Sequence, residues 1–378
     1  MMPYWRLSSF YFCYFAALGA LIPFWGLYLK QLGFSAVEIG ELMAIPMATK
    51  FAAPYLWGWL GDHLGHRMLI VRMGALLTSL VFLAVFWLQG FWELGIAMAL
   101  FSFFWNAVLP QFEAVTLLYL KQQTNRYAQV RVWGSIGFIA AVLLLGVAVD
   151  RNGPTVVLPV LFVIYLSIWL SSLLIADPAA EMVVDTQTPI LSILRKPAVM
   201  AFFLVCFLLQ AGHGVYYTFY SIYLAEVGYS KTLIGQFWAV GVIAEVLVFL
   251  IMHRLLRQLG ARRLLIASLL LAALRWTLIG NFPQAPPILL FAQLLHAATF
   301  GSFHAAAIHL VHHYFTGRHQ GRGQALYSSL SFGAGGALGS LFSGYLWNSA
   351  GAATAFTVAT LITLVAVVIA WRWVVNEL

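Results

Sequence analysis

Eight ionisable side chains stand inside long apolar stretches of this sequence. They are Lys50, Glu113, Arg131, His213, Glu245, Arg275, His296 and His304. A charged group inside a lipid bilayer is costly, so such residues face a protein interior or a polar cavity and commonly serve ion or proton pathways. A guanidinium can also hold a carboxylate through two parallel hydrogen bonds. These residue types therefore indicate anion binding and proton transfer, or else mutual neutralisation that only holds helices together.

The composition places these residues in a membrane. Hydrophobic residues make up 62% of the chain and charged residues 8%, which is typical of a protein that crosses a bilayer many times. The net charge of +8 is spread over alternate loops rather than gathered on one soluble face, so we expect no nucleic acid partner. Cys13 and Cys206 both lie in apolar stretches. We therefore expect no disulfide, no metal site and no cofactor.

Twelve stretches are long and apolar enough to form membrane helices, each of which needs roughly 20 residues. They are 5–30, 37–60, 68–88, 92–120, 127–149, 155–176, 198–227, 231–256, 262–282, 286–315, 321–347 and 352–374. The one long polar loop, 177–197, carries five charged residues and three prolines. We therefore expect an all-α membrane protein with six-helix bundles at 1–176 and 198–378, joined by a cytoplasmic linker at 177–197.

An internal repeat supports the division into two halves. Gly260 and Arg262 follow Gly65 and Arg67 at an offset of 195 residues, and the same offset aligns seven residues of 24–40 with identical residues of 219–235. A common offset over so many positions indicates duplicated structure. We expect the two six-helix bundles to be pseudo-symmetric, as in transporters built from parallel repeats.

The loop at 58–67 carries the clearest family motif. It resembles the signature loop between helices two and three of the major facilitator superfamily, and the matching residues are Gly58, Leu60, Asp62, Gly65 and Arg67. His63 and His66 stand where that family usually has arginine or lysine. The resemblance implies a secondary transporter in which Gly58, Asp62, Gly65 and Arg67 belong to a gate on the cytoplasmic side.

A second resemblance concerns Arg131. The run Arg-Val-Trp-Gly-Ser-Ile-Gly-Phe at 131–138 resembles the fifth-helix motif of lactose permease and of nucleoside symporters. In lactose permease the matching arginine pairs with a glutamate of the fourth helix and binds the sugar. The resemblance therefore implies a substrate-binding role for Arg131, with Glu113 as its partner by placement. Trp133 is expected to contact the ring of an aromatic substrate.

The C-terminal half carries another polar constellation. Residues that share one helical face by i, i+3, i+4 spacing are Gln210, His213, Tyr216, Tyr217 and Tyr220, and then Gln293, His296, Phe300 and His304. Glu245 and Arg275 fall near the middle of their stretches. The sequences around these residues resemble the phenylpropionic acid transporter branch of the superfamily, and this resemblance covers essentially the whole chain. It implies a small aromatic carboxylate as the substrate.

We expect proton-coupled symport of such an acid by alternating access, in a monomer that requires the lipid bilayer. No phosphate-binding Gly-x-x-x-x-Gly-Lys loop is present, so ATP is not the expected energy source. Glu245 is the first candidate for the proton carrier, with His296 and Glu113 as others. The expected substrate contacts are Glu113, Arg131, Trp133, Gln210, His213, Tyr216, Tyr217, Arg275 and His296.

Two alternatives remain open. A neutral sugar or nucleoside could replace the acid, with Glu113 and Arg131 hydrogen-bonding its hydroxyl groups. A remote alternative is a membrane metalloenzyme, because His309, His312 and His313 fit the H-x-x-H-H box of di-iron desaturases. Those enzymes need several such boxes to complete their ligand sets, and the sequence offers no second one. We therefore expect a transporter and not an enzyme.

The distribution of lysine and arginine predicts the orientation. Fourteen of these residues fall in loops on the side of the N-terminus and three on the opposite side. Positive residues stay in the cytoplasm, so both termini are expected there, in a bacterial-type inner membrane.

A reporter fused after Leu378 should therefore be cytoplasmic, and a reporter inserted near Asn152 should be periplasmic. The measurement is the activity of a reporter that functions on only one side of the membrane. The opposite labelling would overturn the orientation and the placement of the 58–67 loop on the cytoplasmic side.

Overall fold

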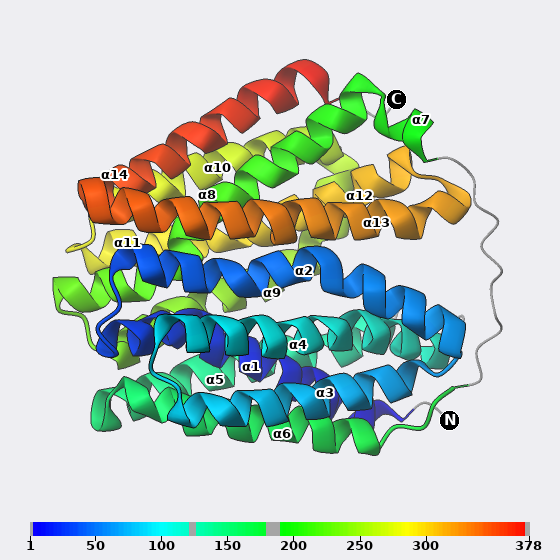
Figure 1. The fold of residues 1–378 in the computed structure, drawn as a ribbon. Helices are drawn as coiled ribbons and strands as arrows, with labels where there is room; N and C mark the ends of the chain where they lie inside the picture. Colours follow the sequence, from blue (N-terminus) through cyan, green and yellow to red (C-terminus); the bar gives the residue numbers. More distant parts are fainter. Residues whose placement is uncertain (1–2, 121–125, 179–189, 375–378) are drawn as a thin grey trace. The chain divides into compact units, whose positions relative to one another are not determined.

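A computed structural model describes residues 3–120, 126–178 and 190–374, apart from the side chains of Asp62 and Arg318 (Figure 1). Throughout those ranges the regular elements are helices. Ten helical stretches within them are long and apolar enough to cross a membrane. The all-α membrane fold expected from the sequence is confirmed.

The first half contains six long helices. They are α1 (Tyr4–Gln31), α2 (Ala36–Leu64), α3 (Arg67–Ala84), α4 (Phe91–Leu120), α5 (Tyr127–Asn152) and α6 (Val157–Leu173). The second half contains α8 (Pro197–Val227), α9 (Lys231–Leu259), α10 (Ala261–Asn281), α11 (Pro286–Leu294), α12 (Phe303–Tyr314), α13 (Gln320–Ser328) and α14 (Gly336–Trp373). A short helix, α7 (Leu191–Leu194), precedes α8.

In the second half, two pairs of labelled helices are each one continuous helical stretch, because a π-helical turn joins the two members of each pair. The π-helix Ala297–Ser302 connects α11 to α12, and the π-helix Ser329–Gly335 connects α13 to α14. Within α14 the chain turns back at Gly351, whose φ of 80° and ψ of 174° are not helical (Figure 1). A positive φ is readily adopted only by glycine. This break divides the apolar stretch Gln320–Trp373 into two helical arms, and the 29-residue α2 is a long helix in addition to the ten candidate spans found among the described residues.

The helices group into two compact units. Unit 1 comprises Met1–Phe34, Thr49–Asp185 and Ser230–Gln236, and unit 2 comprises Ser35–Ala48, Thr186–Tyr229 and Phe237–Leu378. In unit 1, α1 packs on α5 and α6, and α3 packs on α4; in unit 2, α14 packs on α8 and α10. The domain boundaries inferred from the sequence stay a prediction, and most of the expected linker lies outside the described residues.

Glycines at equivalent repeat positions let helices touch in both units. A Cβ on Gly19 of α1 would lie 2.7 Å from the carbonyl oxygen of Phe138 in α5. Gly214 of α8 lies 195 positions after Gly19 and plays the same part in unit 2. There a Cβ would lie 2.2 Å from the carbonyl carbon of Gly339 in α14. Small residues allow such close backbone approach between membrane helices, so the repeat seen in the sequence is also a repeat of packing.

Replacing Gly214 by valine should destabilise unit 2, because the new side chain meets backbone that cannot rotate away. Overpacking of this kind costs about 1–3 kcal/mol, occasionally more. The expected result is a lower unfolding temperature of the purified protein in detergent. Gly321→Ala is the control, because Gly321 is helical and an added Cβ there meets nothing within 4 Å. Equal stability of the two variants would contradict the close packing of α8 on α14.

Candidate functional site

Arg275 of α10 is the centre of a polar cluster in unit 2. Its side chain is 0% exposed. Nη1 donates hydrogen bonds to His296 Nδ1 at 3.0 Å and to Thr299 Oγ1 at 3.1 Å, and Nη2 donates to Gln293 Oε1 at 3.2 Å. Hydrogen bonds from an ionised donor are stronger than neutral ones. These three acceptors compensate part of the cost of removing the charge from water.

Aromatic rings surround the same guanidinium. Arg275 Cζ lies 4.1 Å from the ring centroid of Tyr216 and 4.9 Å from that of Trp276. Such cation–π contacts stabilise a desolvated cation. Tyr216 also donates its hydroxyl hydrogen to Gln293 Oε1 at 2.9 Å, and its ring packs on Trp238 with centroids 4.6 Å apart. The site is thus mostly apolar, with a few polar atoms at fixed positions.

His296 connects Arg275 to Glu245 of α9. Its Nδ1 accepts a hydrogen bond from Arg275, so on the neutral ring the hydrogen is carried by Nε2. That atom lies 3.6 Å from Glu245 Oε2, and the glutamate side chain is 17% exposed. The sequence placed Glu245 and Arg275 at similar depth in neighbouring helices. The structure joins them through an imidazole into a chain of guanidinium, imidazole and carboxylate.

A π-helical turn positions the residues on the α11–α12 span. His296 directly precedes the π-helix Ala297–Ser302, which contains Thr299. Across this turn the rings of His296 and Phe300 lie nearly parallel at 5.6 Å, and those of Phe300 and His304 at 6.2 Å. Short π-helices occur frequently at functional sites. Sequence reasoning missed both the turn and Thr299, although Thr299 follows His296 at a same-face spacing of three residues.

The α8 residues line the other side of this cluster. His213 is 0% exposed and Gln210 is 4% exposed. The imidazole of His213 stacks on Tyr217 with centroids 5.6 Å apart, and it meets Trp276 edge-on at 4.8 Å. Its Nδ1 bonds to the carbonyl oxygen of Leu209 at 2.8 Å. The shared face predicted for α8 therefore brings His213 and the tyrosines next to α10.

The expected pair in unit 1 is arranged differently. The guanidinium of Arg131 lies 3.7 Å from the ring centroid of Phe15, and Glu113 accepts a hydrogen bond from the Tyr127 hydroxyl at 3.1 Å. Glu113 and Arg131 still interact electrostatically. Trp133 donates from Nε1 to the hydroxyl of Tyr4 at 3.0 Å. These residues form a second, half-buried polar group, but in this structure an aromatic ring covers the guanidinium.

The segment 58–67, expected to be a loop, is mostly helical, because α2 continues to Leu64 and only Gly65 and His66 separate it from α3. Its first α3 residue, Arg67, ties α3 to α4. Arg67 Nη1 donates to Gln111 Oε1 at 2.9 Å, and Gln111 Nε2 donates to the carbonyl oxygen of Trp57 at 3.3 Å. Gly65 ends the turn with a φ of 67°. A Cβ on Gly61 would lie 2.8 Å from Gln111 Oε1, so glycine leaves room for that amide. Gln111 was not predicted from the sequence, and the side chain of Asp62 lies outside the described residues.

His312 of the H-x-x-H-H motif and the nearby His304 have local partners. His312 Nε2 lies 3.1 Å from Gln324 Nε2, and His304 Nδ1 lies 3.0 Å from the Tyr327 hydroxyl. Across the ranges that the structure describes, no three His, Cys, Asp or Glu side chains are grouped to hold a metal ion.

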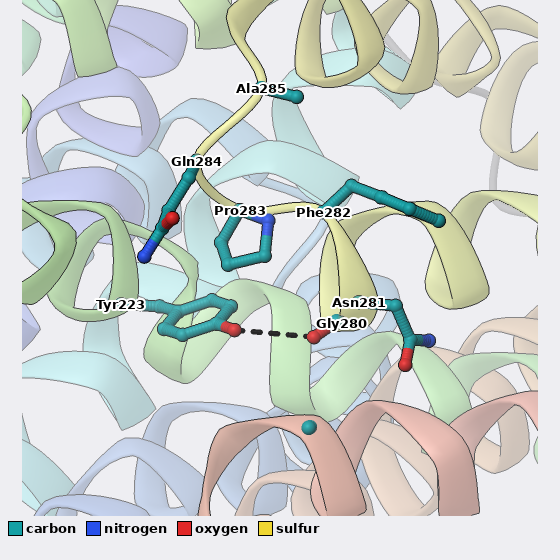
Figure 2. A pocket seen from close by; sticks show the side chains of 8 residues that line it. Tyr223, Gly280, Asn281, Phe282, Pro283, Gln284 and Ala285 are labelled. Carbon is teal, nitrogen blue, oxygen red and sulfur yellow. Dashed lines mark hydrogen bonds between the residues drawn. The ribbon is translucent and has the colours of Figure 1, made fainter.

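A surface hollow of about 510 Å³ lies apart from these charges (Figure 2). It surrounds the turn between α10 and α11, where the Tyr223 hydroxyl donates to the carbonyl oxygen of Gly280 at 3.2 Å. Phe282, Pro283 and Gln284 complete much of its wall, and none of its lining residues carries a formal charge. We therefore place the candidate site at Arg275.

Comparisons with known proteins agree with the fold. A sequence profile of the MFS_1 like family matches residues 4–358. The chain is 32% identical over 354 residues to a probable 3-phenylpropionic acid transporter of Escherichia coli (strain K12), with 91% of each protein covered. It is 25% identical over 365 residues to the maltose permease of Geobacillus stearothermophilus, covering 93% of this chain and 91% of the permease.

Solved structures show the same architecture. A mutant of the nucleoside transporter NupG superimposes with a TM-score of 0.86 at 17% identity, over 98% of both chains. At this identity the similarity establishes the fold alone. The profile match and the 32% identity each extend over most of the sequence. The chain therefore belongs to the MFS_1 like family, and it is a multi-pass membrane transporter of the major facilitator superfamily rather than an enzyme.

Proposed function

We propose that this transporter is a proton-coupled symporter of a small aromatic carboxylate that works by alternating access. The observation that carries the proposal is the chain of Arg275, His296 and Glu245 in unit 2. In such a chain the buried cation can bind an anion, the carboxylate can bind a proton, and the neutral imidazole connects the two groups. Intramembrane groups of this kind commonly mark substrate sites and proton relays.

Charge balance explains how binding and protonation are linked. In the low dielectric of the site, Arg275 is compensated by one negative charge, which Glu245 supplies through His296. A substrate carboxylate at Arg275 supplies that charge instead, and Glu245 can then hold a proton at little electrostatic cost. Substrate and proton therefore bind together and leave together. One proton accompanies each carboxylate in this scheme.

The surroundings of Arg275 favour an aromatic acid. Tyr216, Trp276 and Trp238 form stacked and tilted ring contacts around the guanidinium. A mostly apolar pocket with few polar groups is typical of sites for small organic ligands. The 32% identical relative is described as a probable 3-phenylpropionic acid transporter, and this name agrees with the chemistry of the cluster. Gln210, His213 and Tyr217 are proposed as further substrate contacts.

A neutral polyol is the second candidate substrate, and the polar group of unit 1 favours it. Glu113 and Tyr127 present oxygen atoms beside Arg131, which suits hydroxyl groups of a sugar or nucleoside. Relatives include a maltose permease and, by structure, the nucleoside transporter NupG. In that case Trp133 and Arg131 would contact the ligand. A thermal-shift screen against aromatic acids, sugars and nucleosides separates the two, because a ligand that binds only the native state stabilises it.

We also propose that the 58–67 segment acts as a cytoplasmic gate. The Arg67–Gln111 bond links α3 to α4, and Gly65 permits the tight turn between α2 and α3. Gly58 lies in α2 beside the Gln111 amide. Asp62 completes the motif in the family and is assigned the same role here. We propose that both termini lie in the cytoplasm and that the membrane is an inner membrane of bacterial type, because lysine and arginine concentrate in the loops on the side of the N-terminus.

Glu245→Gln should separate coupling from binding, because the amide imitates the protonated acid permanently. Substrate binding and substrate exchange across a vesicle membrane should survive, since exchange needs no net proton release. Uphill uptake driven by a pH gradient should be lost. Glu226→Gln is the control, because Glu226 is exposed at the end of α8 and should be without effect. Accumulation at the wild-type level in Glu245→Gln would move the proton site to Glu113 or a histidine.

Arg275→Lys should weaken binding of an aromatic acid about tenfold or more, because lysine keeps the charge but loses the planar fork. Arg131→Lys is the matched test in unit 1 and should also weaken binding if that arginine contacts substrate. Both are measured by ligand binding to purified protein, with exposed Arg263→Lys as the control. An unchanged affinity in Arg275→Lys would show that the carboxylate is not held at Arg275.

A further inference from the structure

Five buried polar atoms in the Arg275 cluster lack a hydrogen-bond partner among the described residues. They are Arg275 Nε, Gln293 Nε2, Trp276 Nε1, His213 Nε2 and the Tyr220 hydroxyl. The five residues are each 0% exposed. Burying a polar atom without a partner costs free energy, so most such atoms in proteins are paired. Their concentration in one cluster of unit 2 indicates a site that a ligand completes.

Two of these atoms are donors that suit a carboxylate. Gln293 Oε1 receives hydrogen bonds from Tyr216 and from Arg275. Because a guanidinium can only donate, the oxygen of the amide must face Arg275, and its nitrogen faces the Tyr220 hydroxyl without forming a regular hydrogen bond to it. Arg275 uses Nη1 and Nη2 for protein acceptors, and Nε–H is left unpaired. A carboxylate has two oxygens and can accept from Arg275 Nε and Gln293 Nε2 together.

His213 supplies the opposite kind of group. Its Nδ1 bonds to the carbonyl oxygen of Leu209, and a carbonyl only accepts, so Nδ1 carries the hydrogen. The Nε2 of the neutral ring is then a bare acceptor. Protonation of Nε2 would make His213 a cation, and the positive charge of Arg275 would repel it. The ligand must therefore bring a donor, such as a hydroxyl group, to His213.

The ring of Trp276 contacts both polar ends of the cluster. The centroids of His213 and Trp276 lie 4.8 Å apart, and Arg275 Cζ lies 4.9 Å from the Trp276 ring centroid. The acceptor and the donors therefore border the same indole ring. An aromatic acid with a hydroxyl group on its ring carries a carboxylate and a hydroxyl on one rigid apolar body, which suits polar groups that border a common aromatic surface.

We propose that the substrate class is the ring-hydroxylated aromatic carboxylates, with the carboxylate on Arg275 Nε and Gln293 Nε2 and the hydroxyl donating to His213 Nε2. This rests on the proposed function and narrows it. His213 then determines specificity, because an acid without the hydroxyl leaves a buried acceptor unpaired. Sites built to bond a substrate hydroxyl discriminate strongly against analogues that lack it.

The test compares 3-phenylpropionate with its analogues hydroxylated at ring positions 3 and 4, by calorimetric binding to the purified full chain. In the wild type at least one hydroxylated acid should bind about tenfold more tightly. His213→Phe keeps a ring that can stack on Tyr217 but removes the acceptor, so it should bind all three acids equally. His213→Gln retains an oxygen acceptor and should keep part of the preference. Trp276→Phe removes a donor and part of the ring that contacts Arg275, so it should weaken binding of all three acids but keep the hydroxyl preference.

Equal binding of all three acids by the wild type would overturn this inference and leave the proposed function in place. A hydroxyl preference that persists in His213→Phe would also overturn it. If His213→Phe does not fold, the wild-type comparison and His213→Gln still decide the question. Binding of none of the acids, with stabilisation by a sugar or nucleoside instead, would overturn the proposed function and this inference together.

Discussion

The charge of Arg275 is the constraint on which the rest of unit 2 depends. A cation with no exposed surface is stable only when nearby groups replace its hydration, and removing one partner from such an arrangement is strongly destabilising. His296, Thr299 and Gln293 come from the α11–α12 span, while Tyr216 comes from α8. One guanidinium thereby fixes the relative register of three spans. The polar network around Arg275 and the tight packing of α8 on α14 both hold the spans of unit 2 in fixed relative positions.

Much of the fold was predictable from the sequence because the bilayer sets the length of each span. The stretch predicted at 198–227 is α8 at Pro197–Val227, and the stretch predicted at 262–282 is α10 at Ala261–Asn281. Proline and glycine mark these ends, since Pro197 opens α8 and Gly228 follows it with a φ of 105°. The repeat was visible because nine residues recur at one offset, among them Gly40 and Gly235, which both stand at close helix contacts.

The details of the site were less accessible. Position within each stretch placed Glu245 and Arg275 at compatible depths, and periodicity put His296 on a polar face, but neither showed that the imidazole stands between the two charges. Thr299 follows His296 at a same-face spacing but was missed, because the π-turn that contains it is not visible in the residue pattern. Glu113 and Arg131 were expected to pair, and they do interact electrostatically. The sequence did not show that each also has a local partner in unit 1, the ring of Phe15 for Arg131 and the Tyr127 hydroxyl for Glu113.

The chain from Arg275 to Glu245 also has a consequence for the energetics of transport. If each carboxylate enters with one proton, as proposed, the loaded site carries the same net charge as the empty one. The cycle then moves no charge across the membrane, and the membrane voltage, worth about 2.3 kcal/mol per charge at 100 mV, does no work on it. Accumulation would follow the pH difference alone, roughly tenfold for each pH unit. In a cell with a large membrane voltage but little pH gradient, this protein would not raise the internal substrate concentration above the external one.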